Sequence, residues 1–257
     1  MSIPGPVQCW CYRLIMTTIE DNLQQVRGRI ATACARADRD VNAVTLLAVS
    51  KTFGPDAVLQ ALAAGQRAFG ENYIQEGVEK ILALRETRLD AAIEWHCIGP
   101  IQSNKTRLVA AHFDWVQSVD RLKVAQRLSE QRPTGMAPLQ VCLQVNVDGG
   151  ATKSGVTPAE LSALAEAVAS LPHLRLRGLM CIPEPADSFE AQRAVFLQAR
   201  ALFDGLNARG FRLDTLSMGM SDDLEAAVAA GSTLVRVGRS VFGSRTAPPQ
   251  RPDRSSV

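Results

Sequence analysis

The chain has few residues of the kinds that bind metal ions. It contains three histidines, and none of its six cysteines stands in a C-x-x-C pair. Structural zinc sites and disulfide frameworks depend on such spacings. We therefore expect neither a metal site nor a disulfide framework, and we interpret the chain as a reduced, cytoplasmic protein.

The chain also lacks long apolar runs and a strong charge of either sign. No apolar run approaches the roughly 18 residues that span a bilayer, and the formal net charge is +2. No glycine-rich segment ends in Gly-Lys-Ser/Thr, which excludes a P-loop. A hydrolase is disfavoured as well, because residues 219–223 lack the second glycine of a nucleophile elbow and no histidine follows Ser221. Membranes and nucleic acids are not expected as partners.

Eight short β-rich runs alternate with stretches of helical spacing. Such alternation indicates βαβ units and a parallel sheet. The 257 residues match the length of a (β/α)8 barrel, so we predict a single TIM-type barrel with an extra N-terminal helix over residues 19–37. The alternative is an open, doubly wound sheet. The predicted strands are 45–51, 68–72, 94–99, 115–120, 139–147, 174–182, 215–221 and 234–238.

The barrel is expected to occupy residues 16–245 as one domain. Residues 1–15 carry two prolines and a Cys-Trp-Cys, and they do not resemble a secretion signal. We interpret them as a disordered leader that arises from a mis-called start codon, with Met16 as the initiator. A genuine disordered N-terminal tail is the alternative. Residues 246–257, which contain three prolines, are expected to form a disordered tail.

Lys51 is the most informative residue of the sequence. It follows the apolar run of the first predicted strand and is one of only five lysines. In a barrel of this kind, chemistry takes place at the carboxyl ends of the strands. An amine that loses hydration there has a lowered pKa, and it can form a Schiff base with an aldehyde. The alternative is a lysine whose charged head simply reaches solvent.

The segments after the seventh and eighth strands predict an anion site. Gly219 allows a ligand to approach the backbone closely. Ser221 is expected to be the N-cap of the next helix, whose free N–H groups attract a phosphate. Gly238 forms a second small turn where these barrels often bind phosphate. Helix capping without a ligand is the alternative.

A Schiff-base lysine beside a phosphate site indicates pyridoxal 5′-phosphate (PLP), which carries an aldehyde and a phosphate on one ring. Its pyridine nitrogen needs a protein partner, and Arg236 on the eighth strand is the candidate. A permanently cationic arginine would keep that nitrogen unprotonated. A structural ion pair is the alternative role for Arg236.

Several segments resemble the pyridoxal phosphate homeostasis protein family, and the resemblance covers about residues 16–245. It implies a single-domain PLP-binding barrel, similar to the N-terminal domain of alanine racemase, with PLP held as a Schiff base on Lys51. The matching segments are A-V-S-K-T at 48–52, F-G-E-N-Y-I-Q-E at 69–76, W-H-C-I-G-P-I-Q-S-N-K at 95–105, K-S-G at 153–155, R-G-L-M at 177–180, S-M-G-M-S-D-D at 217–223 and V-R-V-G at 235–238.

The same resemblance implies further cofactor-binding residues. Asn72 and Arg236 match positions that line the cofactor, and His96 either faces the ring or is an inward-packed core histidine. The residues implied to hold the phosphate are Ser217, Gly219, Met220, Ser221 and Gly238.

Two positions need separate comment. Lys153 matches a second lysine associated with cofactor handling, and a solvated loop lysine is its alternative. The family usually has threonine or serine after Gly238, where this chain has Arg239 followed by Ser240. Either Arg239 pairs with the phosphate or Ser240 substitutes.

The resemblance implies a protein of intracellular vitamin B6 homeostasis that binds PLP and regulates its supply, without established catalysis. The chain has two tyrosines and no room for the second domain that supplies a base in alanine racemase. We expect a monomer that passes PLP to apo-enzymes or senses its level. A small PLP-dependent amino-acid racemase or lyase is the alternative, and a barrel for another phosphorylated aldehyde or ketone is the third reading.

Overall fold

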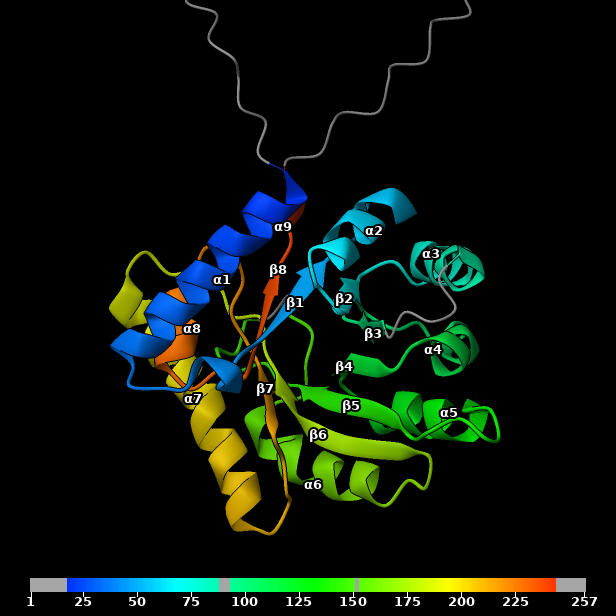
Figure 1. The fold of residues 1–257 in the computed structure, drawn as a ribbon. Helices are drawn as coiled ribbons and strands as arrows, with labels where there is room; N and C mark the ends of the chain where they lie inside the picture. Colours follow the sequence, from blue (N-terminus) through cyan, green and yellow to red (C-terminus); the bar gives the residue numbers. More distant parts are fainter. Residues whose placement is uncertain (1–17, 88–92, 151–152, 244–257) are drawn as a thin grey trace, which may run out of the picture.

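Eight parallel strands form a closed barrel, in sequence order from β1 to β8 (Figure 1). This computed structural model describes residues 18–87, 93–150 and 153–243. Four residue pairs, from Thr45–Leu234 to Ala48–Val237, join the first strand to the last, so the barrel is confirmed and the open sheet is not. The strands are β1 Thr45–Val49, β2 Ala68–Glu71, β3 Glu94–Cys97, β4 Trp115–Val119, β5 Leu139–Gln144, β6 Leu174–Met180, β7 Thr215–Ser217 and β8 Leu234–Val237.

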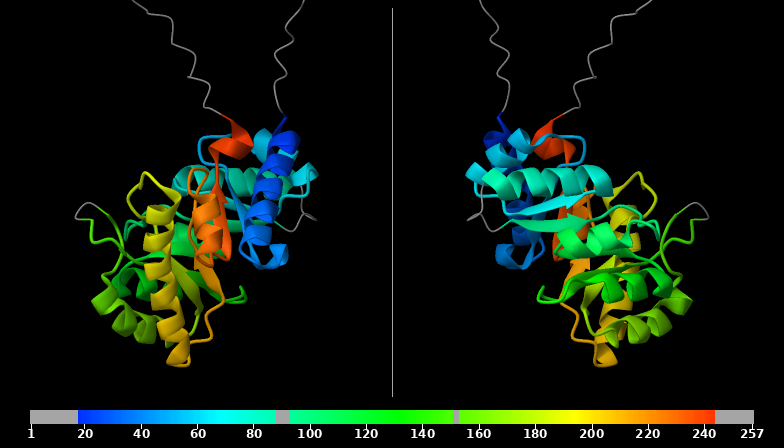
Figure 2. Two further views of the ribbon diagram at one scale, coloured as in Figure 1. Left: turned by 90° about the vertical axis from the view of Figure 1, so that its left-hand side faces the viewer. Right: turned by 90° about the vertical axis from the view of Figure 1, so that its right-hand side faces the viewer.

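Helices cover the outside of the barrel, as the two side views in Figure 2 show. A short 3-10 turn, Val41–Ala43, precedes β1. The helices are α1 Ile19–Arg36, α2 Pro55–Ala63, α3 Ile74–Thr87, α4 Thr106–His112, α5 Leu122–Gln131, α6 Pro158–Ala169, α7 Phe189–Ala208, α8 Leu224–Ala229 and α9 Arg239–Phe242.

The extra N-terminal helix, α1, packs against α8 and α9. It begins with a capping box, in which the Thr18 hydroxyl accepts the Asp21 N–H and the Asp21 carboxylate accepts the Thr18 N–H. The two bonds satisfy backbone donors that a helix start leaves open. Its buried face carries Leu23, Val26 and Ile30.

Each strand begins at the residue that the sequence predicts, and each ends earlier than predicted. The residues that were predicted to extend each strand instead leave the sheet at its carboxyl edge. Thr52, after β1, has φ +68°, and Gly219, after β7, has φ +94°. Extended strands do not reach this left-handed region, so the chain turns out of the sheet where the candidate site residues stand.

Side chains along each strand point alternately to the helices and into the barrel. In β1, Leu46 and Ala48 belong to the large apolar layer beneath the helices. Leu47 belongs instead to a separate small cluster with Ala68 and Leu234. The barrel interior therefore has little apolar packing of its own, and it has space for polar side chains.

The predicted leader at residues 1–15 and the predicted tail at residues 246–257 lie outside the described residues. The domain boundaries and the start at Met16 thus stay predictions. Within the described ranges, no helix combines the length and the apolar character needed to cross a bilayer.

Candidate cofactor site

Lys51 stands just beyond the carboxyl end of β1, half-buried. The end of β8 lies beside it, because a Cβ added to Gly238 would be 3.2 Å from the Val49 carbonyl oxygen. Strand closure therefore brings the predicted lysine and one of the predicted phosphate turns to the same mouth of the barrel. Gly238 also precedes the first residue of α9, where backbone N–H groups have no partner within the helix.

A buried ionic cluster supports the turn that carries Lys51. The Lys80 ammonium lies 2.6 Å from Glu71 Oε1 and donates to the Ser50 carbonyl oxygen at 2.9 Å. Glu76 accepts the Thr52 N–H at 2.6 Å, and Lys80 lies 3.3 Å from Glu76. These bonds fix the backbone on both sides of Lys51. Burial raises the pKa of Glu71 despite the attraction of Lys80, so the cluster is expensive to desolvate.

The loop after β7 approaches the barrel closely at Gly219. The Gly219 carbonyl accepts the Arg236 N–H at 2.9 Å, which ties this loop to β8. The expected N-cap role of Ser221 is wrong: α8 begins at Leu224, and Asp223 is the residue before it. A turn at residues 221–223 intervenes, because the Asp223 carboxylate accepts the Met220 N–H at 2.5 Å.

Two arginines hold the loops after β7 and β8. Arg29, in α1, donates to the Ser221 carbonyl at 2.8 Å and forms an ion pair with Glu225. Arg239 lies 3.0 Å from Asp222, and its side chain is 78% exposed. Arg239 thus bridges the two loops at the surface, and the sequence had given no sign of the contribution from Arg29.

Arg236 is buried in the barrel interior. It donates to Ser217 Oγ at 2.7 Å and to the Cys181 carbonyl at 2.8 Å. Burial lowers the pKa of the guanidinium, although an arginine stays charged near neutral pH. No carboxylate pairs with Arg236 among the described residues, so the structural ion pair considered from the sequence is absent there.

His96 is fully buried in the barrel interior and has partners on both ring nitrogens. Nε2 lies 2.8 Å from Glu94 Oε1, and Nδ1 lies 2.9 Å from Gln117 Nε2. Its ring also stacks on Trp115, at 5.1 Å between centroids. These contacts are those of the inward-packed histidine that the sequence left open, and a direct contact with the cofactor stays a prediction.

Two asparagines at the mouth have a buried side-chain oxygen with no partner among the described residues. They are Asn72, after β2, and Asn146, after β5. A buried polar atom without a hydrogen bond is costly, and such atoms often await a ligand. Asn72 was predicted, whereas Asn146 was missed. The sequence feature that could have indicated Asn146 is its position two residues beyond Gln144. The alternation of β5 puts both residues on the face that points into the barrel.

Lys153 lies in the loop between β5 and α6. Its ammonium is 3.4 Å from Glu184 Oε1, and its side chain is 25% exposed. It is therefore paired with an acidic side chain of the next loop rather than fully solvated.

Substitution of Gly219 by alanine should destabilise the protein more than the same change at Gly210. The two glycines have nearly equal φ, +94° and +95°, so both variants incur the same backbone strain. A Cβ at Gly219 would lie 2.5 Å from the Ala227 Cβ, whereas nothing lies within 4 Å at Gly210. We expect an additional loss of about 1–3 kcal/mol at Gly219 from overpacking. Urea unfolding of both variants measures it, and equal losses would show that the loop is not closely packed.

Among the residues with described positions, no three His, Cys, Asp or Glu side chains come together as metal ligands. The donor set at the mouth is instead a lysine amine, amide oxygens, an arginine and backbone N–H groups. This set suits a small organic molecule with an aldehyde, a ring and an anionic group.

Comparison with known proteins places the chain in a family. The family model of the alanine racemase N-terminal domain matches residues 21–246. A pyridoxal phosphate homeostasis protein from Pseudomonas aeruginosa is 59% identical over 230 residues, which cover 90% of this chain and 97% of the relative.

Solved structures agree. The structure of PipY from Synechococcus elongatus with PLP bound is 36% identical, covers 88% of this chain and 100% of that chain, and has a TM-score of 0.75. Alanine racemase from Clostridium difficile, at 17% identity and a TM-score of 0.68, shares the fold over 58% of its own chain. The chain therefore belongs to the pyridoxal phosphate homeostasis protein family, with the fold of the alanine racemase N-terminal domain.

Proposed function

We propose that this protein binds PLP at the carboxyl mouth of the barrel, covalently through Lys51, and serves intracellular vitamin B6 homeostasis without catalysing a reaction. The observation that carries the proposal is the meeting of the end of β1 with the turns after β7 and β8 at one mouth. The PLP bound to PipY and the name of the Pseudomonas aeruginosa relative support it.

The residues at this mouth fit the cofactor. The chemistry that PLP supplies is an aldehyde carbon that accepts a lysine amine. Lys51 provides the amine. Arg236 has five N–H groups, and its bonds to Ser217 and Cys181 leave others for a ring nitrogen. The unpartnered oxygens of Asn72 and Asn146 can accept hydrogen bonds from the ligand.

The phosphate site combines two short segments. The Met220 N–H is donated to Asp223, so we assign the phosphate contacts of the first segment to the backbone N–H groups of Gly219 and Ser221. Those of the second segment are assigned to the N–H groups after Gly238. The Ser217 hydroxyl is engaged below this level, with Arg236 and Gln117. Arg239 is held by Asp222 at the surface, so we assign the side-chain contact with the phosphate to Ser240. Lys153 handles the cofactor at a second position, beside Glu184.

Competing nucleophiles are suppressed. Burial raises the pKa of Cys97, Cys142 and Cys181 to about 12. Thiols with such values stay protonated, and only a thiolate attacks an aldehyde efficiently. The four described cysteines are free and buried, which also suits the reducing cytoplasm in which we place the protein.

The protein holds the cofactor rather than using it. A racemase needs a base on each face of the cofactor, and Tyr73 is 54% exposed at the rim. The Pseudomonas aeruginosa relative is covered over 97% of its length, whereas the alanine racemase chain is covered over 58%. In this proposal a monomer carries PLP and releases it to apo-enzymes.

Titration of the purified protein with PLP, followed by incubation with alanine and serine, tests the proposal. We expect binding of one tightly held PLP and no sustained product formation. Turnover of either amino acid would favour the racemase or lyase. Absence of any binding would refute the PLP site itself.

A further inference from the structure

A line of hydrogen bonds crosses the interior of the barrel, from Arg236 to the opposite mouth. Arg236 Nη1 donates to Ser217 Oγ at 2.7 Å, and Ser217 Oγ donates to Gln117 Oε1 at 2.6 Å. Gln117 Nε2 lies 2.9 Å from His96 Nδ1, and His96 Nε2 lies 2.8 Å from Glu94 Oε1. Gln117, Ser217 and His96 are each 0% exposed.

The direction of every bond in this line follows from its two ends. An arginine can only donate, so the Ser217 oxygen accepts and its hydrogen goes to the Gln117 oxygen. The Gln117 amide must then donate to His96 Nδ1, which therefore carries no proton. His96 holds its proton on Nε2 and donates it to Glu94. If the oxygen and nitrogen of the Gln117 amide were exchanged, His96 Nδ1 would carry the proton. His96 Nε2 would then be unprotonated and would lie against the Glu94 carboxylate, unless the imidazole were doubly protonated.

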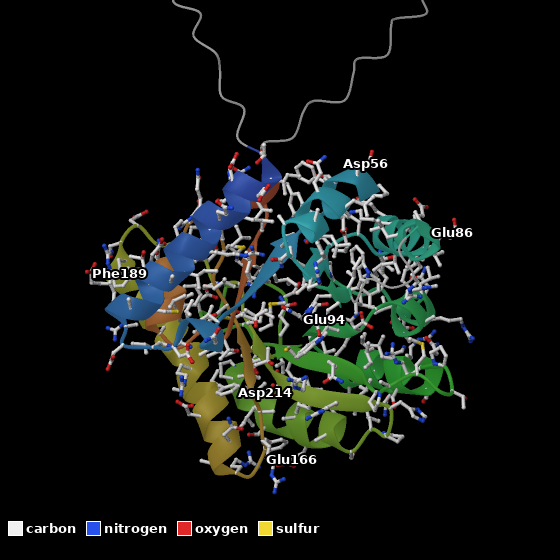
Figure 3. The ribbon with its side chains drawn as sticks, in the orientation of Figure 1. Asp56, Glu86, Glu94, Glu166, Phe189 and Asp214 are labelled. Carbon is white, nitrogen blue, oxygen red and sulfur yellow. The ribbon has the colours of Figure 1, made fainter. Side chains whose placement is uncertain are left out.

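Glu94 is suited to be the accepting end. Burial would raise its pKa, but hydrogen bonds from His96 and Trp115 outweigh that effect and lower the pKa overall. Glu94 lies at the start of β3 with its side chain 48% exposed, and Asp214 lies just before β7 (Figure 3). A cavity of about 390 Å³ opens there.

Two other charged groups that line this cavity are paired with each other. Arg177 forms an ion pair with Asp214 at 2.7 Å and lies over the Trp115 ring at 4.6 Å. Glu94 is therefore the acceptor that His96 meets, and its lowered pKa keeps it ionised at neutral pH. The line runs from a buried cation to a carboxylate at the edge of solvent.

We propose that Gln117 is a positioning residue, which fixes His96 as its Nε2–H tautomer and, through Ser217, holds Arg236 in the orientation that presents its other N–H groups to the cofactor site. The part that concerns the cofactor rests on the proposed function. The part that concerns His96 does not, because it follows from the protein's own hydrogen bonds.

The first test uses the protein without added PLP. The chain has three histidines, so ¹⁵N-histidine NMR can identify His96 by comparison with variants of the other two. We expect a single neutral tautomer with the proton on Nε2. A proton on Nδ1, or a mixture of tautomers, would overturn the proposal.

A near-isosteric variant sharpens this test. The carboxylate of Gln117→Glu can accept from Ser217 but cannot donate to His96, so Nδ1 should carry a proton that it donates to the new carboxylate. Gln140→Glu is the matched control, because Gln140 accepts from Arg177 at the same mouth but is not part of the line. It should leave the His96 tautomer unchanged. Wild-type nitrogen shifts in Gln117→Glu would contradict the assignment.

The second test measures the PLP dissociation constant of Gln117→Leu. Loss of one hydrogen bond in the support of Arg236 should weaken PLP binding about tenfold, while the link to Lys51 still forms. Unchanged affinity would overturn the role of Gln117 toward Arg236. If PLP bound to no form of the protein while His96 behaved as expected, the proposed function would fail and the assignment of the line would stand.

Discussion

A Lys51→Ala variant should lose the covalent attachment of PLP completely. Alanine has no amine, and the other lysine near the β1 turn, Lys80, is engaged with Glu71 and the Ser50 carbonyl beneath it. The absorbance band of the lysine-linked cofactor should therefore disappear. Non-covalent binding should persist at lower affinity, because Arg236 and the two backbone turns remain.

The matched control for this variant is Lys153→Ala. Lys153 is paired with Glu184 in another loop, so its loss should leave the band at the strength of the wild type. A full-strength band in Lys51→Ala would move the attachment to a different lysine, and Lys153 would be examined first. The two spectra together separate the primary site from the second lysine.

Replacement of Lys80 by methionine should have the largest effect on stability. The Lys80–Glu71 pair is buried, with side-chain exposures of 3% and 0%. Removal of one partner of such a pair leaves an uncompensated charge, which costs about 3–5 kcal/mol. Without Lys80, the Ser50 hydroxyl still donates to Glu71 Oε1 at 2.6 Å, but this neutral donor does not balance the charge, and the second oxygen has no partner among the described residues. Unfolding in guanidinium chloride measures the loss.

Arg200→Met is the control for the ion pair itself. Arg200 and Asp204 form a pair on α7 with exposures of 42% and 53%, and exposed pairs contribute at most about 1 kcal/mol. If Lys80→Met and Arg200→Met lowered the free energy of unfolding equally, the buried ion pair would contribute no more to stability than an exposed one.

The pH dependence of the Lys80→Met variant has a defined sign. The pKa of Glu71 is raised in the fold, chiefly by burial and in spite of Lys80, and removal of Lys80 raises it further. A carboxyl group with a raised pKa stabilises the fold below its unfolded value, near 4.5, and that stability is lost as the pH rises through the folded value. The free energy of unfolding of the variant should therefore lie furthest below that of the wild type at neutral pH and approach it toward pH 4.5.

Much of the fold could be predicted from local patterns. The apolar runs indicated the start of all eight strands, because barrel strands are largely buried on both faces, as β2, β4 and β8 are over their whole length. The ends of the strands were predicted too late, since residues such as Thr52 and Gly219 turn out of the sheet through φ values that a run of apolar letters does not reveal. Ser221 was wrongly predicted as an N-cap because a turn at residues 221–223 separates it from α8.

The candidate site was predictable only where residues lie close in sequence to a strand end. Lys51, Asn72, Gly219 and Gly238 each stand within two residues of a strand end. The support beneath them could not be predicted, because its members come from distant segments. Ser217 and Gln117 are 100 residues apart in sequence and 2.6 Å apart in space. Arg29 reaches the Ser221 carbonyl from a helix that no motif connected with the site.

Reduction of the PLP-loaded protein with borohydride, followed by peptide mass mapping, tests the central claim most directly. The reduced linkage is stable, so the modified lysine can be read from the mass of its peptide. We predict one pyridoxyl-phosphate adduct, on Lys51. An adduct confined to any of the other four lysines, or none after loading with PLP, would contradict the account.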